Sequence, residues 1–175
     1  MKYVALIRGV NVGGNSKVSM SELKKFCDQA GLENVITYIN SGNVIFDSNL
    51  SSAKLAKLFE KILVRNFNVD TFVVILTKPE IDSVIKNTPN SWLTDGVRCY
   101  VAFTLDKTSP KEIIENVQLK VDVDSIDTGP KCVYMTTLTS GLTKSGFTKM
   151  VGTPIYKQIT MRNKNTLYKI AELMK

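Results

Sequence analysis

One order of strand-like and helix-like segments runs twice along this 175-residue chain, and it limits the fold more than any other feature. The first copy opens with an apolar run at 3–7 that predicts a strand. The segment 35–48, VITYINSGNVIFDS, predicts two strands around a tight turn at Ser41-Gly42, and TFVVILT at 71–77 predicts another strand. The first half therefore carries four expected strands.

Two amphipathic helices are expected between these strands, and a short third helix after them. Ser19-Met20-Ser21-Glu22 has the sequence of a capping box, in which a hydroxyl and a carboxylate satisfy free backbone N–H groups at a helix start. Apolar residues then recur at helical spacing before Gly31, and again from Leu55 to Leu63. Pro79 lies near the start of the short closing helix.

The same order returns from residue 97. VRCYVAFT at 97–104 predicts a strand, and Ser109-Pro110-Lys111-Glu112 is a second capping box. A second hairpin is expected around the turn residues 128–131. A short amphipathic segment, a brief strand near 155–160 and a final helix complete the second copy.

Strand, helix, strand, strand, helix, strand is the order of the split-βαβ, ferredoxin-like fold, with two helices on one face of four antiparallel strands. We therefore expect an α+β protein that arose by internal duplication, with two tandem ferredoxin-like (βαββαβ) subdomains, each with a trailing helix. The expected bounds are 1–88 and 97–175. A linker at 89–96 carries Pro89 and Gly96, and Trp92 is expected to pin it to a neighbouring surface.

The segment RGVNVGGNSK follows the first expected strand and leads into the first helix. Free N–H groups and the positive end of a helix dipole attract anions at such a place. A Walker A phosphate loop is excluded, because two residues separate Gly14 from Lys17 and no hydroxyl follows the lysine. The alternative is that the glycines only permit a tight turn while Arg8 pairs with a nearby carboxylate. The candidate anion ligands are Arg8, Asn11, Gly13, Gly14, Asn15 and Lys17.

The relation of this loop to the first hairpin depends on strand direction. We take the first and third strands of a ferredoxin-like half to run parallel. The loop is then expected at the end of the sheet opposite the Ser41-Gly42 turn, so that the two polar motifs form no common site. Hairpin geometry alone explains the turn.

A second polar cluster opens the final helix, in the segment MRNKNTLY. Either Asn163 or Asn165 can cap that helix. Capping uses only one asparagine, so the remaining polar side chains are candidates for ligand binding. The cluster consists of Arg162, Asn163, Asn165 and Thr166.

Several kinds of catalytic site are excluded by composition. The chain has no histidine, which removes Ser-His and Cys-His nucleophile pairs and the commonest zinc ligand. Its three cysteines are far apart and lie at apolar positions, which predicts packing rather than redox or zinc chemistry. Asp122, Asp124 and Asp127 are expected at an exposed strand end. We predict no metal site, no cofactor and no catalytic residue.

The net charge of +7 is concentrated near the C-terminus. Residues 143–175 hold seven Lys and Arg against one Glu, while residues 1–142 hold 16 against 15. Such asymmetry favours an anionic partner, although a solvated helix face explains it equally well. No apolar run is long enough to span a bilayer and no signal peptide is evident, which predicts a cytoplasmic protein without a membrane partner.

Four segments carry a resemblance to a known family: RGVNVGGNSKVSM, YINSGNVIF, FTKMVG and RNKNT. In this order and spacing, the chain resembles the bacterial domain-of-unknown-function family 1697 over its whole length. The resemblance implies a pair of ferredoxin-like α+β subdomains and no activity. Similar sequences often have Trp where this chain has Lys164. If that Trp stacks on a ring, this chain has lost the contact.

These features favour a non-catalytic module that binds an anionic, phosphate-bearing ligand. The first alternative is a small-molecule enzyme that uses Lys or Tyr chemistry in a cleft between the subdomains. The second is a weak nucleic-acid binder, which we favour less because the third strands lack the aromatic signature of RNA-recognition motifs. An oligomerising adaptor is a third. The sequence predicts no oligomeric state.

Overall fold

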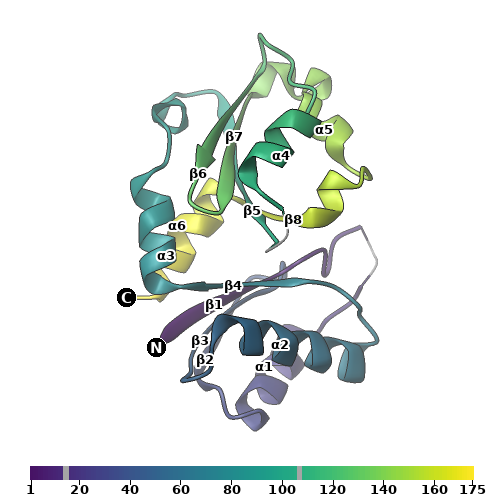
Figure 1. Ribbon diagram of the computed structural model, residues 1–175, viewed down its shortest axis with the longest axis vertical. Coiled ribbons are helices and arrows are strands. Elements are labelled where there is room, and N and C mark those ends of the chain that lie inside the picture. Colours follow the sequence, from purple (N-terminus) through teal and green to yellow (C-terminus); the bar gives the residue numbers. More distant parts are fainter. Residues whose placement is uncertain (14–15, 106–107) are drawn as a thin grey trace. The chain divides into compact units, whose positions relative to one another are not determined.

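The computed structural model describes residues 1–13, 16–105 and 108–175 (Figure 1). The chain divides into two compact units. The first unit comprises Met1–Ile81 and Lys169–Lys175, and the second comprises Asp82–Tyr168. Each unit contains one four-stranded antiparallel sheet, so the protein has a mixed α and β fold.

The sheet of the first unit has the strand order β2-β3-β1-β4. Its strands are β1 (Lys2–Ile7), β2 (Glu33–Tyr38), β3 (Asn43–Asp47) and β4 (Val73–Thr77). β1 lies in the middle, with Val4 opposite Ile45 of β3 and Leu76 of β4. These aliphatic residues suit the pleated, buried surface of central strands.

Two helices cover one face of this sheet, α1 (Met20–Gln29) and α2 (Ser52–Phe67) (Figure 1). Leu23, Phe46 and Phe59 are fully buried in the core between helices and sheet. Ser19 caps α1, since its hydroxyl accepts a hydrogen bond from the Glu22 N–H at 3.4 Å. A further helix, α3 (Lys78–Lys86), follows β4 as the sequence predicts.

The second unit has the equivalent strand order, β6-β7-β5-β8. Its strands are β5 (Val97–Thr104), β6 (Asp124–Gly129), β7 (Cys132–Leu138) and β8 (Ile159–Asn163). Its helical segments are η1 (Asn90–Leu93), α4 (Pro110–Asn116), η2 (Thr139–Lys144), α5 (Gly146–Met150), η3 (Ile155–Gln158) and α6 (Lys164–Leu173), of which α6 continues beyond the unit.

The capping box at the start of α4 is present as predicted. The Glu112 N–H donates to the Ser109 hydroxyl at 3.2 Å, and the Ser109 N–H donates to the Glu112 carboxylate. The last strand differs from the prediction, because β8 begins only at Ile159. Pro154 has an α-helical backbone conformation and is the N-cap residue of η3, a 3-10 helix of one turn. Residues 155–158 are therefore not extended.

The three cysteine thiols are buried and unbonded, as the apolar pattern predicts. In the described parts of the chain, no helix combines the length and apolar character needed to cross a bilayer. Within the same ranges, no three Asp, Glu or Cys side chains gather as a metal site would require.

Candidate functional site

A pocket of about 430 Å³ opens in the second unit, at the first turn of α6. Backbone and side chains from three segments line it: η1 with the residues after it, the beginning of β5, and the junction between β8 and α6. The lining residues are Trp92, Thr94, Val97, Arg98, Cys99, Tyr100, Asn163, Lys164 and Asn165.

Strand register explains why these segments meet. β5 pairs with β8 up to the Tyr100–Asn163 pair, after which the chain turns into α6. β5 continues beyond this point to Val97, so its first residues lie beside the first turn of the helix. Asn163 caps the helix, since its side-chain oxygen accepts a hydrogen bond from the Thr166 N–H at 2.8 Å.

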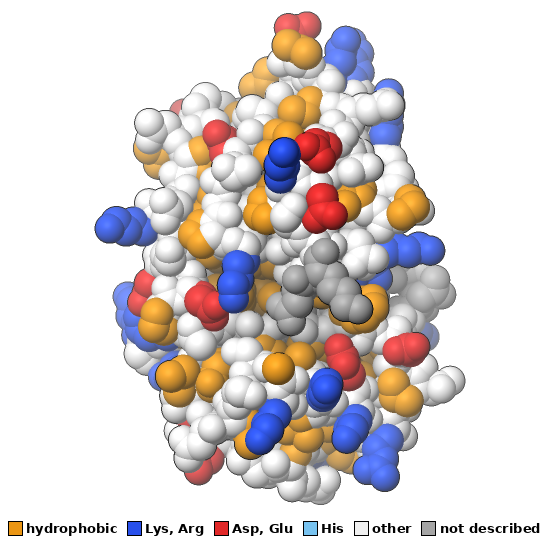
Figure 2. Space-filling model, viewed as in Figure 1, with side chains coloured by type: hydrophobic (Ala, Val, Ile, Leu, Met, Phe, Trp, Pro, Cys, Tyr) orange, Lys and Arg blue, Asp and Glu red, His pale blue; other side chains and the backbone are white. Residues whose placement is uncertain are grey.

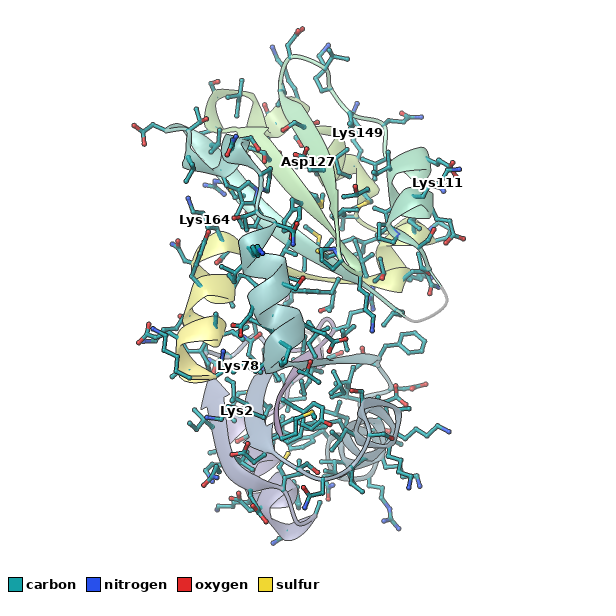
Figure 3. The ribbon with its side chains drawn as sticks, turned by 60° about the vertical axis from the view of Figure 1, so that its left-hand side comes forward. Lys2, Lys78, Lys111, Asp127, Lys149 and Lys164 are labelled. Carbon is teal, nitrogen blue, oxygen red and sulfur yellow. The ribbon has the colours of Figure 1, made fainter. Side chains whose placement is uncertain are left out.

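The third wall of the pocket is held by contacts to β7. The hydroxyls of Ser91 and Thr136 lie 3.1 Å apart, and the rings of Trp92 and Tyr134 meet edge to face at 5.5 Å between centroids. The Lys164 ammonium, at the first turn of α6 (Figure 3), donates a hydrogen bond to the Trp92 carbonyl oxygen. Trp92 thus anchors the segment that the sequence marks as a linker.

The charged side chains of the described pocket lining are both cationic. Arg98 is exposed and Lys164 half-buried, and the described lining contains no Asp or Glu to neutralise them. Burial raises the pKa of the Cys99 thiol, although nearby Lys164 lowers it in part. Cys99 is therefore a neutral thiol at physiological pH and a poor nucleophile.

The structure divides the predicted MRNKNTLY cluster. Asn163 and Asn165 line the pocket. Arg162 is buried on β8, where it donates to the Thr160 hydroxyl at 3.0 Å and to the Met161 carbonyl at 2.7 Å, and burial lowers its pKa to about 10. Thr166 is buried as well. Neither is among the described residues that line the pocket.

In the predicted anion loop after β1, the side chain of Asn11 makes three internal hydrogen bonds. It donates to the carbonyls of Val18 and Asn40, at 2.9 and 2.8 Å, and accepts from the Val18 N–H at 2.9 Å. Its φ of 56° lies in the left-handed region that asparagine tolerates. The Asn11 amide therefore closes the loop, which accounts for its presence without a ligand.

The remaining loop candidates have varied surroundings. Arg8 is half-buried, with its backbone N–H bonded to the Phe72 carbonyl at 3.1 Å. Gly13 has a positive φ of 65° and open space around it, and Lys17 is exposed. Gly14 and Asn15 lie outside the described residues. Anion binding by this loop stays a prediction.

The expected separation of this loop from the first hairpin is wrong, because β1 and β3 run antiparallel. The end of β1 therefore lies beside the start of β3, and the Ile7 N–H donates to the Gly42 carbonyl at 2.8 Å. Gly42 has a φ of +74°, and a Cβ there would lie 2.6 Å from Val10 Cγ2. The two polar motifs are neighbours.

Asp124 also differs from the expectation of an exposed strand end. It is buried, and its carboxylate accepts four hydrogen bonds. The donors are the Ser145 hydroxyl at 2.6 Å, the Gly146 N–H at 2.7 Å, and the Thr137 hydroxyl and Lys120 N–H at 3.0 Å. Protein donors thus occupy the carboxylate, whose role is to fix the start of α5 to the sheet.

Sequence reasoning missed Arg98, which brings a cation to the pocket. Its only sequence signal is a charged residue at one position of the strand VRCYVAFT. The register that places it beside α6 joins residues more than sixty positions apart, and local patterns do not reveal such pairing.

Comparisons with known proteins place the chain in a group without assigned activity. A family model described as a protein of unknown function (DUF1697) matches residues 1–134. A solved structure of the conserved bacterial protein SP0830 from Streptococcus pneumoniae is similar, with 30% identity and a TM-score of 0.88, over 99% of this chain and 98% of that one. No curated protein matches the chain.

Proposed function

The chain belongs to the DUF1697 family of proteins of unknown function, and we therefore propose a function from its own geometry. We propose that the protein is a non-catalytic module that binds a small anionic, phosphate-bearing molecule in the pocket of the second unit. The observation that carries this proposal is the presence of Arg98 and Lys164 in a described lining without carboxylates.

Two further features of the pocket favour an anion. The ten-residue helix α6 begins at the pocket, and its dipole adds partial positive charge there. Arg98 offers a planar guanidinium that can grip two phosphate oxygens at once. The Asn165 amide and the Thr94 hydroxyl supply neutral polar groups, as recognition of a sugar or phosphate ester requires.

The size of the pocket is that of a small-molecule site, since such sites span roughly 300–1,000 Å³. A volume of about 430 Å³ fits a phosphorylated metabolite. Binding without catalysis is favoured because the chain has no histidine and the Cys99 thiol is held neutral by burial.

One observation favours the alternative of a small-molecule enzyme. Tyr100 and Lys164, whose side chains have the chemistry of a general acid and a general base, line the same pocket. Product formation from phosphorylated small molecules that is lost in Tyr100→Phe, with ligand affinity retained, would favour this alternative over binding alone.

Isothermal titration calorimetry with inorganic phosphate and a pentose phosphate tests the binding proposal. Arg98→Gln is expected to weaken binding about tenfold or more, since a charge-assisted hydrogen bond contributes about 1.5–3 kcal/mol. Lys120→Gln, which removes an exposed charge outside the described lining, is the control and should leave affinity unchanged. Equal affinity in wild type and Arg98→Gln would contradict the proposal.

We further assign both units to the ferredoxin-like class and infer an internal duplication, with subdomains at 1–88 and 97–175. These bounds follow the sequence repeat and differ from the compact units, in which residues 82–88 belong to the second unit and Lys169–Lys175 to the first. The support is the equivalent strand order of the two sheets. In each sheet the first and third strands of the unit lie in the centre, and the second and last strands form the edges. Three unbonded thiols favour a reducing compartment, so we propose a cytoplasmic protein.

A further inference from the structure

A row of four cations runs along the solvent face of α2 in the first unit. Lys54, Lys57, Lys61 and Arg65 are exposed and recur at intervals of three and four residues, which places them on one side of the helix. We name these four residues the basic stripe. Figure 2 shows Lys and Arg side chains gathered at the lower end of the visible face, over α2.

The basic stripe is unfavourable for the helix itself. Lys57 and Lys61, and Lys61 and Arg65, are like charges four residues apart, and each such pair costs about 0.2–0.5 kcal/mol. Glu60 is the one acidic residue of α2. In α1, by contrast, Lys24 pairs with Asp28 at 2.8 Å four residues on. Arg65 in the last turn suits the helix dipole and Lys57 lies near Glu60, but helix stability leaves Lys54 and Lys61 unexplained. An external anion accounts for the whole row.

A hollow of about 550 Å³ lies beside the stripe. Lys57, Glu60, Lys61, Val64 and Arg65 line it, and Val64 is 47% exposed. Much of this wall consists of the aliphatic stems of Lys and Arg with the Val64 side chain. The hollow thus offers apolar surface directly next to cationic groups.

We propose that the basic stripe binds the phosphate backbone of single-stranded nucleic acid, with a sugar or base in the hollow. Eleven residues of helix separate Lys54 from Arg65, or about 16 Å at 1.5 Å per residue. The spacing of phosphates is about 3.4 Å along the axis of a stacked duplex strand and longer in an extended single strand, so this length spans at most about five nucleotides. Arg65 can stack its guanidinium on a base. The contacts are to the backbone and carry no sequence preference.

An anionic membrane fits this surface less well. The apolar face of α2, with Leu55, Phe59 and Leu63, is fully buried in the core of the unit. A helix that binds in the membrane interface needs its apolar face free to enter the lipid. The stripe is therefore limited to electrostatic contact, which suits a flexible polyanion.

Fluorescence anisotropy with labelled poly-dT and poly-U oligonucleotides at several salt concentrations tests this proposal. The variant Lys57→Gln, Lys61→Gln, Arg65→Gln is expected to lose tenfold or more in affinity at low salt. The slope of log K against log salt should fall by about 2, the value for three lost contacts to a single strand. Lys61→Gln alone repeats the test with a smaller change if the triple variant does not fold.

The matched control removes three exposed lysines from the second unit, in Lys111→Gln, Lys144→Gln, Lys149→Gln (Figure 3 labels Lys111 and Lys149). It has the same net charge and should retain the wild-type affinity. Equal losses in both triple variants, or no wild-type binding at low salt, would overturn the proposal. The proposal would also be overturned if the protein bound phosphatidylserine vesicles through the basic stripe and did not bind the oligonucleotides. The pocket proposal is independent, since neither variant alters its lining.

Discussion

The ammonium of Lys164 donates a hydrogen bond to the backbone carbonyl of Trp92, 72 residues earlier in the chain. This bond joins the first turn of α6 to η1 across the pocket of the second unit. Lys164 is therefore both a cation of the pocket and a link between two of its walls.

Replacement of this lysine should therefore affect stability. Lys164→Met leaves the partly buried Trp92 carbonyl without its donor, and we expect a loss of about 1–3 kcal/mol in the free energy of unfolding. Urea denaturation measures it. Lys169→Met, which breaks only the exposed pair with Glu172 on the same helix, should have little effect. Similar losses in both variants would contradict the role given to the Lys164 bond.

Acid stability should depend on Asp124. Burial alone raises the pKa of this carboxyl, but hydrogen bonds from Ser145, the Lys120 and Gly146 N–H groups, and Thr137 outweigh burial and lower it. The folded pKa thus lies below the unfolded value of about 3.9. The ionised carboxylate stabilises the fold above that value, and this stabilisation is lost as the pH falls through the folded pKa.

Asp124→Asn places an amide N–H₂ among donors, so we expect a loss of about 2 kcal/mol at pH 7. The variant should also lose less stability than the wild type when the pH is lowered from about 5 to about 3, a range that includes the unfolded pKa of about 3.9. Asp127→Asn, at an exposed position of the same strand, is the control. Urea denaturation at both pH values measures the free energy of unfolding. An equal loss on acidification in the wild type, Asp124→Asn and Asp127→Asn would contradict the role given to Asp124.

The contact between the β1 loop and the first hairpin predicts a large effect of Gly42→Ala. The added methyl group would lie 2.6 Å from Val10 Cγ2 and 2.9 Å from Ile7 Cβ, at a φ of +74°. We expect a loss of about 3 kcal/mol from backbone strain and overpacking together. Gly31→Ala has a similar φ of +83° but open space, and should lose about 1 kcal/mol. Thermal unfolding of both variants compares the two costs.

The loop and the pocket can be separated as anion sites. Arg8→Ala with Lys17→Ala removes both cations of the loop and should leave phosphate binding by the pocket unchanged, because the pocket retains Arg98 and Lys164. Calorimetry on this double variant measures the effect. Loss of all phosphate-dependent heat and thermal stabilisation, with the fold intact, would instead assign the ligand to RGVNVGGNSK.

The order of the elements could be read from the sequence because its signals are local. Each of these signals lies within one helix or strand. Examples are the spacing of apolar residues, the capping box of Ser109 and Glu112, and the helix cap at Asn163. The start of β8 could not be read in this way, since Pro154 begins a 3-10 turn whose residues also suit a strand. The direction of β1 relative to β3 required the sheet order, which we took incorrectly.

The candidate site was predicted only in part, for the same reason. Asn163 and Asn165 stand beside each other at a helix start, where local polarity marks them. Arg98 reaches the pocket through strand pairing, and Asp124 is buried by donors up to 22 residues away. Arg162 sits in the same polar run, but it lies on a strand whose alternate residues face opposite sides, and its side chain is buried.

A titration of the ¹⁵N-labelled protein with inorganic phosphate, followed by two-dimensional NMR, tests the central claim most directly. The account predicts saturable shifts of the backbone amides of Arg98, Cys99, Lys164 and Asn165, which all belong to the pocket lining. In Arg98→Gln the midpoint of these shifts should move to a phosphate concentration about tenfold higher or more. Shifts confined to the amides around Gly13 and Lys17, or no saturable shift in the wild type, would contradict it.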